Sequence, residues 1–365
     1  MMDMNAAFDK NFWQDKRVFL TGHTGFKGAW LSLWLNTLGA NVAGFALKPP
    51  TTPNLFELAD IRSFVTDFRG DIRDAETLST ALNKFRPDII FHMAAQPIVR
   101  LSYLSPRETY ETNVMGTVNL FEAVRRSNGV RAVVNITTDK CYENNEWPWG
   151  YRESDRLGGR DPYSSSKACS ELVTHAYRNS FFAVEHYEEH GVAIATARAG
   201  NVIGGGDFAI DRLVPDCIRA FLNGREMVVR SPKAVRPWQH VLEPLSGYLL
   251  LARKLYEYGP QYGEAWNFGP QDSDARSVED ILGVLLNKFQ SPSTYDMDKN
   301  VQFYEASSLR LDCSKARLKL NWQPKWTIEQ ALDKIVEWTK VYVAKGDVAS
   351  ISAKQIDEYV NCKGY

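Results

Sequence analysis

The segment Arg17-Val-Phe-Leu-Thr-Gly-His-Thr-Gly-Phe-Lys-Gly28 decides the fold class. It predicts a short apolar strand, Arg17 to Thr21, that passes through a glycine-rich turn into a helix. Gly22, Gly25 and Gly28 follow a GxxGxxG spacing, which lets the backbone approach a pyrophosphate at the N-terminus of the helix. Because the turn follows the first strand of a β-α-β series, a dinucleotide site is favoured over a glycine-rich turn that binds nothing.

Short β-branched runs alternate with longer amphipathic stretches through the first two thirds of the chain, which predicts a parallel sheet covered by helices. Further strands are expected at residues 41–46, 64–68, 88–92, 132–137, 192–198 and 265–268. Helices are expected at residues 27–38, 75–85, 105–127 and 162–189, the last with a proline at its start. The predicted fold is therefore α/β, a Rossmann-type doubly wound parallel sheet with a smaller C-terminal α/β substrate-binding domain.

We place the domain boundary after Gly204-Gly-Gly206, because prolines and short basic segments interrupt the alternation of strands and helices there. We expect residues 11–203 and about 236–271 to form the dinucleotide-binding domain. Residues from about 204 to 235 and 272–365 then form the smaller domain, which binds the substrate.

The composition limits the kinds of partner that the chain is expected to bind. Lys and Arg total 43 against 44 Asp and Glu, a net charge of −1, so no chain-wide attraction to nucleic acid or to an anionic membrane is expected. The five cysteines lack a CxxC pair, which argues against a disulfide framework or a zinc site and favours a reducing compartment. No apolar run approaches the ~18 residues of a membrane span, and the N-terminus lacks an apolar signal core. We expect a cytoplasmic protein that binds no metal.

The segment Asp161-Pro-Tyr-Ser-Ser-Ser-Lys167 carries the sharpest chemical information. Tyr163 and Lys167 are four residues apart on a predicted helix, so they share one face. A tyrosine with a pKa of about 10 is a poor base near neutrality. A nearby lysine and a cationic nicotinamide would stabilise the phenolate and lower the pKa of Tyr163. This pair follows the glycine turn, with a threonine at the end of the intervening strand, and predicts a nicotinamide-dependent active site.

Several further motifs carry a resemblance to a known family. They are His92-Met-Ala-Ala95, Thr112-Asn-Val-Met-Gly-Thr117, Ile136-Thr-Thr-Asp-Lys140, Arg198-Ala-Gly-Asn201, Arg236-Pro-Trp-Gln-His-Val241, Leu311-Asp-Cys-Ser-Lys-Ala316 and Leu320-Asn-Trp-Gln-Pro324. Over nearly its whole length the chain resembles the extended short-chain dehydrogenase/reductase superfamily and, within it, the nucleotide-sugar 4,6-dehydratases. The segment from Thr138 to Glu153 resembles in particular the branch that acts on CDP-glucose.

The resemblance implies a lyase that oxidises carbon 4 of a hexose, eliminates water across carbons 5 and 6, and returns the hydride to carbon 6. Its cofactor would be NAD, recycled in each turnover, and its substrate a nucleotide-diphosphate sugar bound by the smaller domain. It further implies a homodimer or dimer of dimers, acting in deoxysugar biosynthesis for the lipopolysaccharide O-antigen. Helices 105–127 and 162–189 would form the interface. The candidate interface residues are Val114, Val118, Phe121, Leu172 and Phe181.

The same resemblance implies residue roles. Tyr163 would take the carbon 4 hydroxyl proton, Thr138 would orient the reacting oxygen, and Lys167 would hold the nicotinamide ribose. Asp139 would protonate the departing carbon 6 hydroxyl. Lys140 would take the carbon 5 proton, a position where many relatives acting on thymidine-diphosphate sugars carry glutamate. The expected cofactor contacts, from the motifs and the resemblance together, are Gly22, Thr24, Gly25, Phe26, Lys27, Gly28, Asp71, Ile72, Ala94, Ala95, Thr112, Tyr163 and Lys167. The expected substrate contacts are Gln96, Arg100, Asn201, Arg212 and Arg236.

The residues by themselves leave several interpretations open. No acid ends the second strand, where Phe45-Ala-Leu-Lys-Pro-Pro50 stands, so they do not choose between NAD and NADP. A nucleotide-sugar 4-epimerase would share the tyrosine, lysine and threonine but would have no use for Asp139 and Lys140. A 4,6-dehydratase for another nucleotide sugar and a non-catalytic dinucleotide-binding protein are also compatible with the motifs. The cluster of Trp147, Trp149 and Tyr151 could stack on a base or a sugar, or pack on the core.

Overall fold

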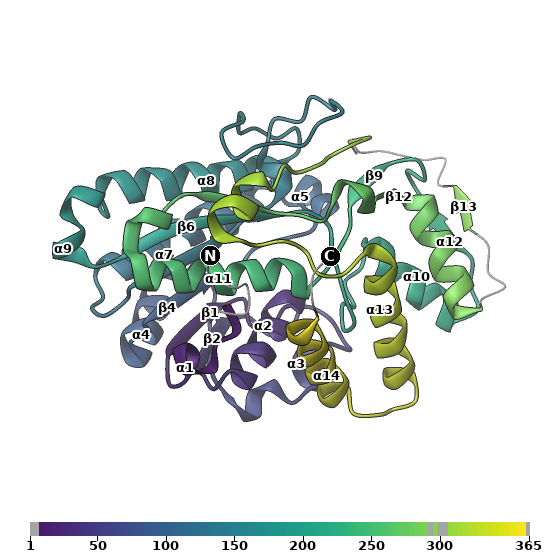
Figure 1. Cartoon of the computed structure of the whole chain (residues 1–365), viewed down its shortest axis with the longest axis horizontal. Coiled ribbons are helices and arrows are strands. Elements are labelled where there is room, and N and C mark those ends of the chain that lie inside the picture. The colour runs from purple at the N-terminus through teal and green to yellow at the C-terminus, as the bar shows by residue number, and fades with distance from the viewer. Residues whose placement is uncertain (1–6, 291–294, 298–305, 363–365) are drawn as a thin grey trace.

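A parallel seven-stranded sheet forms the centre of the molecule in a computed structural model that describes residues 7–290, 295–297 and 306–362 (Figure 1). Within these residues the strand order is β11-β6-β5-β4-β1-β2-β3. The order reverses direction between β1 and β4, which defines a doubly wound sheet with a ligand crevice at the carboxyl ends of these strands. Its strands are β1 (Arg17–Thr21), β2 (Asn41–Ala46), β3 (Val65–Arg69), β4 (Ile89–His92), β5 (Ala132–Ile136), β6 (Ala193–Ala199) and β11 (Ala265–Phe268).

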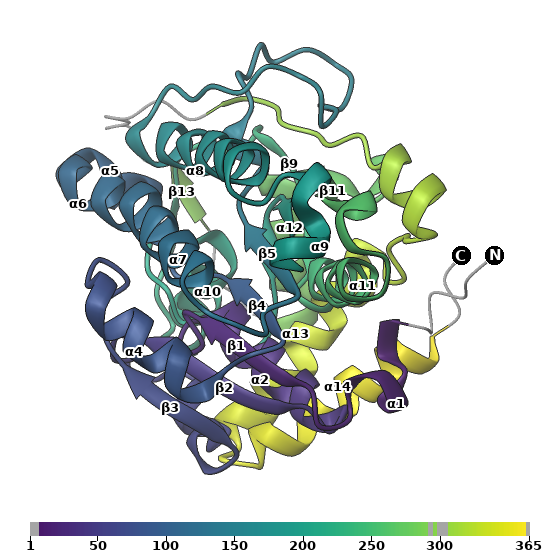
Figure 2. The same cartoon turned by 90° about the vertical axis from the view of Figure 1, so that its left-hand side faces the viewer.

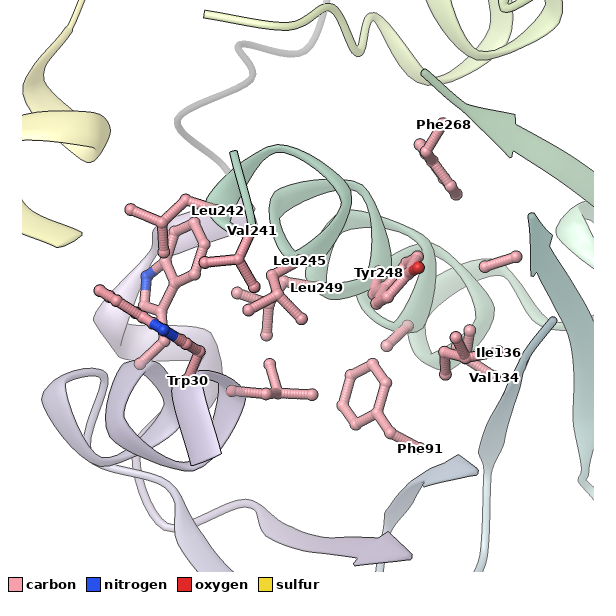
Figure 3. Close-up of a cluster of buried hydrophobic side chains, with 14 of the residues drawn as sticks. Trp30, Phe91, Val134, Ile136, Val241, Leu242, Leu245, Tyr248, Leu249 and Phe268 are labelled. Atoms are coloured by element: carbon pink, nitrogen blue, oxygen red, sulfur yellow. The ribbon is translucent and has the colours of Figure 1, made fainter. Parts of the chain in front are cut away.

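Helices cover both faces of the sheet (Figure 2). The long ones are α2 (Phe26–Thr37), α4 (Ala75–Phe85), α7 (Gly116–Arg125), α8 (Pro162–Ser180), α11 (Leu242–Tyr258) and α14 (Val348–Asn361). One core lies between the sheet and α2, α11 and α14, and Figure 3 shows the part of it where Leu245 and Leu249 of α11 face Phe91 of the sheet. The other core lies under α4 and α7. Each fully buried leucine or phenylalanine contributes about 1.5–3 kcal/mol to the stability of the folded state. The two cores therefore hold the helices against both faces of the sheet.

A smaller unit follows β6 and has a core of its own, which includes Trp238, Leu285 and Ile335. Its helices are α10 (Leu213–Leu222), α12 (Val278–Phe289) and α13 (Ile328–Val343). Its short strands are β7 (Val202–Ile203), β8 (Met227–Val229), β9 (Val235–Pro237), β10 (Gln239–His240), β12 (Ala275–Ser277) and β13 (Tyr295–Met297), which pair as β7–β10, β8–β13 and β9–β12.

Short elements complete the described chain. The short helices are α1 (Lys10–Trp13), α3 (Leu55–Leu58), α5 (Val99–Leu104), α6 (Pro106–Tyr110) and α9 (Tyr187–His190). The single turns are η2 (Ile61–Ser63), η3 (Glu111–Met115), η4 (Asp139–Cys141), η5 (Val184–His186), η6 (Gly259–Tyr262), η7 (Asp272–Asp274) and η8 (Ala316–Leu320). None of the described helices combines the length and hydrophobicity that a bilayer span requires.

The predicted architecture is confirmed, with two corrections. The helix expected over residues 162–189 ends at Ser180, because the chain turns there and buries Phe182 in the core under α4 and α7. The helix expected over 105–127 is present but is interrupted by a π-helical turn, η3, between α6 and α7. Phe121, a candidate for a subunit interface, is instead fully buried in the same core. It therefore cannot contribute to such an interface without refolding of α7.

Candidate active site

A cavity of about 1220 Å³ opens at the carboxyl ends of the strands, between the sheet and the smaller unit. This volume exceeds the roughly 300–1,000 Å³ of a usual small-molecule site, so the cavity has room for a cofactor and a substrate together. Every residue predicted for the cofactor, the substrate or catalysis lines it except Asp139, which is fully buried directly behind it. Segments far apart in the chain thus meet where the crevice of a doubly wound sheet is expected.

The glycine turn forms a tight cradle at the N-terminus of α2. Gly22 has a φ of +79°, and a Cβ there would lie 2.8 Å from the backbone nitrogen of Ala94. A Cβ on Gly28 would lie 2.2 Å from the carbonyl oxygen of Gly22. Gly25 caps α2 without any side-chain hydrogen bond, so the first N–H groups of the helix face the cavity and fit an anionic pyrophosphate. The chain therefore has the residues to hold a dinucleotide.

His92, which ends β4, is a satisfied core histidine. Its Nδ1 lies 2.7 Å from Thr21 Oγ1 and its Nε2 lies 3.2 Å from Thr117 Oγ1. Burial lowers the pKa of His92 to about 3, so the ring is neutral. The hydroxyl of Thr21 also accepts hydrogen bonds from the N–H groups of Met93 and Ala94, and this network fixes the end of β4 beside the glycine turn.

Tyr163 and Lys167 lie on the first two turns of α8 and line the cavity side by side with Thr138. Burial disfavours the phenolate and raises the pKa of Tyr163 to about 12, and the neighbouring Thr138 hydroxyl offsets this only in part. Among the protein's own groups burial outweighs any stabilisation of the phenolate by Lys167, and the expected lowering, which includes a cationic nicotinamide, stays a prediction. Lys167 itself donates to the carbonyl of Ile136 at 3.1 Å, and burial lowers its pKa to about 8.

A buried ion pair supports the strand ends behind these residues. Glu171, one helical turn beyond Lys167, accepts hydrogen bonds from Arg198 at 2.8 Å, from Thr196 at 2.7 Å and from the hydroxyl of Thr137. Because α8, β5 and β6 all contribute to this network, it fixes α8 relative to the turn that carries Thr138.

Asp139 and Lys140 form the turn η4 at the end of β5. Asp139 Oδ1 accepts from Thr138 Oγ1 at 2.9 Å and lies 3.5 Å from Lys140 Nζ. Asp139 Oδ2 is buried and, within the described residues, has no hydrogen-bond partner. Lys140 is partly exposed to the cavity, and its Nζ lies 3.4 Å from Asn201 Oδ1. The short segment that follows β5 thus places an acid and an amine close to Tyr163 of α8.

A second, half-buried lysine, Lys27, lines the same cavity. Lys27 Nζ lies 3.2 Å from the hydroxyl of Tyr248, a residue of α11 that sequence reasoning missed because it lies in an ordinary apolar helix pattern. Burial lowers the pKa of Lys27 to about 7, with smaller contributions from Lys167 and Arg212. The glycine turn therefore carries a titratable amine close to Lys167 and Asp139, two of the predicted catalytic residues.

The predicted substrate residues differ in how many hydrogen bonds and ion pairs they already make within the protein. The Gln96 side chain donates to Thr109 at 2.9 Å and accepts from the N–H of Ile98 at 2.6 Å, so its amide is largely engaged. Arg212 pairs with Asp207 at 3.0 Å, and Arg100 pairs with Asp211 at 3.0 Å. Asp207 and Asp211 line the cavity as well. They were not predicted, since no motif marks this part of the chain.

The part of the cavity near the end of β3, where the adenosine of the cofactor is expected, has both acidic and basic side chains. Asp71, which follows β3, pairs with Arg73 at 2.6 Å, and this contact holds the pKa of Asp71 below its usual value. Lys48 lines the same end of the cavity. These contacts leave the choice between NAD and NADP as open as the sequence does.

A Rossmann sheet with a threonine at the end of β5 and a Tyr–Lys pair on α8, facing a cofactor-sized cavity, defines the class of short-chain dehydrogenases/reductases. The sequence identifies a family within this class. Residues 19–335 match the model of the GDP-mannose 4,6 dehydratase family, and the chain belongs to that family.

Individual relatives agree with this assignment. The chain is 53% identical over 353 residues to the CDP-glucose 4,6-dehydratase of Salmonella typhimurium, covering 97% of this chain and 98% of the relative. It is 29% identical over 280 residues to the dTDP-glucose 4,6-dehydratase of Streptomyces antibioticus, covering 75% and 76%. Among solved structures, the dTDP-glucose 4,6-dehydratase of Streptomyces venezuelae, determined with NAD bound, superposes with a TM-score of 0.75 at 24% identity, covering 91% of this chain and 99% of that one.

The fold alone does not separate dehydratases from epimerases. The UDP-glucose 4-epimerase of Thermotoga maritima superposes with a TM-score of 0.76 at 21% identity, covering 90% of this chain and 99% of that one. The distinction therefore has to come from the side chains of the site.

Proposed function

We propose that this chain is an NAD-dependent CDP-glucose 4,6-dehydratase, which converts CDP-glucose to CDP-4-keto-6-deoxyglucose and water. The observation that carries the proposal is the cluster of Tyr163 and Lys140 on one cavity with Asp139 buried behind it, where Thr138 donates to the aspartate and lies beside the tyrosine. The 53% identity to the Salmonella dehydratase along 97% of the chain supports the sugar and its nucleotide.

The chain's own groups provide each proton transfer in turn. Tyr163 takes the proton of the carbon 4 hydroxyl, with Thr138 orienting the oxygen. The glycine turn, Tyr163 and Lys167 would hold NAD, which would supply the hydride acceptor for carbon 4 and the hydride donor for carbon 6. Once carbon 4 is a ketone, the carbon 5 proton is acidic, and Lys140 takes it in its neutral form. Asp139 gives a proton to the departing carbon 6 hydroxyl from its buried position.

Asp139 and Lys140 also favour a dehydratase over a 4-epimerase. An epimerase needs only the tyrosine, the lysine and the threonine, because its sugar loses and regains hydride at a single carbon. In this chain the buried Asp139 carboxylate has one oxygen free of any hydrogen bond within the described residues. Burying such a group costs stability, and a proton donor in the reaction accounts for its presence.

Incubation of the purified protein with NAD and each of CDP-, dTDP-, UDP- and GDP-glucose tests the proposal. We expect a 4-keto-6-deoxy product by NMR with CDP-glucose, and no net accumulation of reduced cofactor under steady turnover. Conversion of CDP-glucose to CDP-galactose would show an epimerase instead. Faster turnover of another nucleotide sugar would leave the dehydratase assignment intact and contradict the cytidine preference.

The proposal extends to domains, assembly and cell biology. Residues 11–203 and about 236–271 would bind NAD, and about 204–235 and 272–365 the nucleotide sugar, in a homodimer or dimer of dimers. A cytoplasmic location is supported by Cys141, Cys169, Cys217 and Cys313, which are free thiols. We further propose a role in deoxysugar biosynthesis for the O-antigen, since further reductions and isomerisations can elaborate a 4-keto-6-deoxy sugar.

A further inference from the structure

A second cavity, of about 520 Å³, lies outside the active site. The loop between η4 and α8, which projects at the top of Figure 1, forms one wall, and the chain just before and within η8 forms the other. None of the residues that line it lines the catalytic cavity. The residues that matter below are Trp147, Trp149, Arg152, Arg310, Asp312 and Arg317.

An open aromatic face forms the entrance to this second cavity. Trp149 is 62% exposed, unusual for such a large apolar side chain. Its ring lies 5.5 Å from the ring of Trp147, which stacks at 5.0 Å on Tyr151. Tyr151 in turn stacks at 5.3 Å on Tyr142. Because this ladder of rings supports one side of Trp149 and leaves it largely open to solvent, the indole is a fixed platform for a planar ring.

The cavity also contains two buried donors without acceptors. Trp147 Nε1 and Arg310 Nε are inaccessible to solvent and have no hydrogen-bond partner among the described residues. No carboxylate of the described chain lies within 4.0 Å of the Arg310 guanidinium, whereas Arg152 pairs with Asp312 at 3.2 Å. Indole and guanidinium groups can only donate, and leaving such buried donors unpaired lowers stability. The Nη groups of Arg310 belong to a partly exposed side chain of the cavity, so a ligand that bonds to this guanidinium must bring acceptor oxygens.

The acids of the cavity do not neutralise Arg310. Asp312 accepts hydrogen bonds from Arg152 and from the N–H of Ser314, and Asp155 accepts from the N–H of Arg152. The exposed Asp272 is offset by the exposed Arg317. Among the partly buried charges that line the cavity, Arg310 and Asp155 make no ion pair within the described residues. Asp155 already accepts a backbone N–H, and Arg310 is the charge that favours an anion.

We propose that this cavity binds a nucleoside phosphate, with its base stacked on Trp149 and its phosphate oxygens on Arg310. Stacking of a base on an aromatic side chain and a charge-assisted bond from arginine are the two interactions that nucleotide sites combine. The site lies apart from the catalytic cavity, so the proposal does not depend on the identity of the sugar substrate.

The test uses the full-length NAD-loaded protein labelled with 5-fluorotryptophan. The chain has 10 tryptophans, so ¹⁹F NMR, with Trp149→Phe to assign the signal, separates this site from the catalytic cavity. Titration with CMP and AMP should shift the Trp149 signal saturably, and cytidine, adenosine or inorganic phosphate should bind at least about tenfold more weakly. Arg310→Gln should weaken nucleotide binding by about tenfold or more, and Arg310→Lys by less.

Arg156→Gln is the matched control, because Arg156 is an exposed arginine of the same loop that does not line the cavity. It should leave the titration unchanged, and all the variants should keep their turnover of CDP-glucose, which verifies the fold. An unmoved Trp149 signal through the millimolar range would overturn the proposal. So would equal affinity in Arg310→Gln, or equal affinity for the nucleoside without its phosphate.

Discussion

Among single residues, Lys140, the proposed carbon 5 base, should decide whether elimination can follow oxidation. Lys140→Ala should abolish dehydration but still permit oxidation at carbon 4, because Tyr163 and Thr138 remain in place. Tyr163→Phe should suppress both, since neither ketone nor acidic carbon 5 proton then forms. Removing a positioned base typically costs 10²–10⁴-fold. The measurement is single-turnover absorbance of reduced nicotinamide, together with NMR detection of a 4-keto hexose that retains its carbon 6 hydroxyl.

Deuterium exchange at carbon 5 provides an independent check on Lys140. In heavy water the Lys140→Ala variant should exchange this hydrogen much more slowly than the wild type. Lys48→Ala serves as the control, because Lys48 lines the same cavity at the adenosine end. Near-native exchange and dehydration by Lys140→Ala would assign the base to another group.

Lys167 gives the activity a predictable pH dependence. Burial lowers the pKa of Lys167 to about 8, so its ammonium is lost as the pH rises through that value. If the charged form holds the cofactor ribose and favours the phenolate of Tyr163, turnover of the apoenzyme reconstituted with limiting NAD should fall above about pH 8. Lys167→Arg should move this basic limb upward, because the guanidinium stays charged.

In that experiment the titration of Lys27 must be distinguished from that of Lys167, because burial lowers the pKa of Lys27 to about 7. Lys27→Met removes the second amine and should leave the basic limb where it is. A limb that disappears in Lys27→Met and persists in Lys167→Arg would assign the titration to Lys27 instead.

At the scale of secondary structure, the junction of β1 with α2 depends on the absence of side chains. A Cβ on Gly28 would lie 2.2 Å from the carbonyl oxygen of Gly22 and 2.7 Å from His23 Cα, and both neighbours are backbone atoms that cannot rotate away. Gly28→Ala should therefore lower the melting temperature and weaken NAD binding by calorimetry by at least tenfold. Gly283→Ala is the control, because nothing lies within 4 Å of its Cβ in the middle of α12.

That control should stabilise the protein by about 0.5–1 kcal/mol, since alanine is the better helix former. If Gly28→Ala bound NAD normally, the glycine turn would be shaping the fold and not the cofactor site. Both outcomes are measurable on the same preparations by thermal unfolding and titration.

The secondary structure could be predicted wherever a local pattern dictates it. The buried parallel strands β1, β2 and β11 lie at the predicted residues because continuous apolar runs bounded by turns specify them. The end of α8 could not be predicted, because the sequence stays compatible with a helix until tertiary packing buries Phe182. The site divides in the same way: turn and helix motifs locate Tyr163 and Asp139, whereas Tyr248 and Asp211 reach the cavity only through the fold.

At the scale of the whole molecule, an exposed apolar strip on α5–α8 predicts how two copies associate. Leu172 on α8 is 56% exposed, and Leu104, Met115 and Phe181 are exposed on the neighbouring segments. Such a strip costs free energy in water and is typical of an interface. Phe121 lies buried beneath it, so the interface depends on the outer residues. Leu172→Glu should therefore shift the protein from dimer to monomer in light scattering coupled to size-exclusion chromatography.

Leu318→Glu provides the control, because Leu318 is an 85% exposed leucine on η8, outside these helices. Leu104 and its neighbour Leu101 also line the catalytic cavity, so the proposed interface borders the site. Loss of the partner should then loosen α5 and raise the KM for CDP-glucose more than it lowers kcat. A monomeric wild type, or a Leu172→Glu variant that stays dimeric, would exclude these helices as the interface. A monomeric variant with an unchanged KM would show that each active site functions independently of its partner.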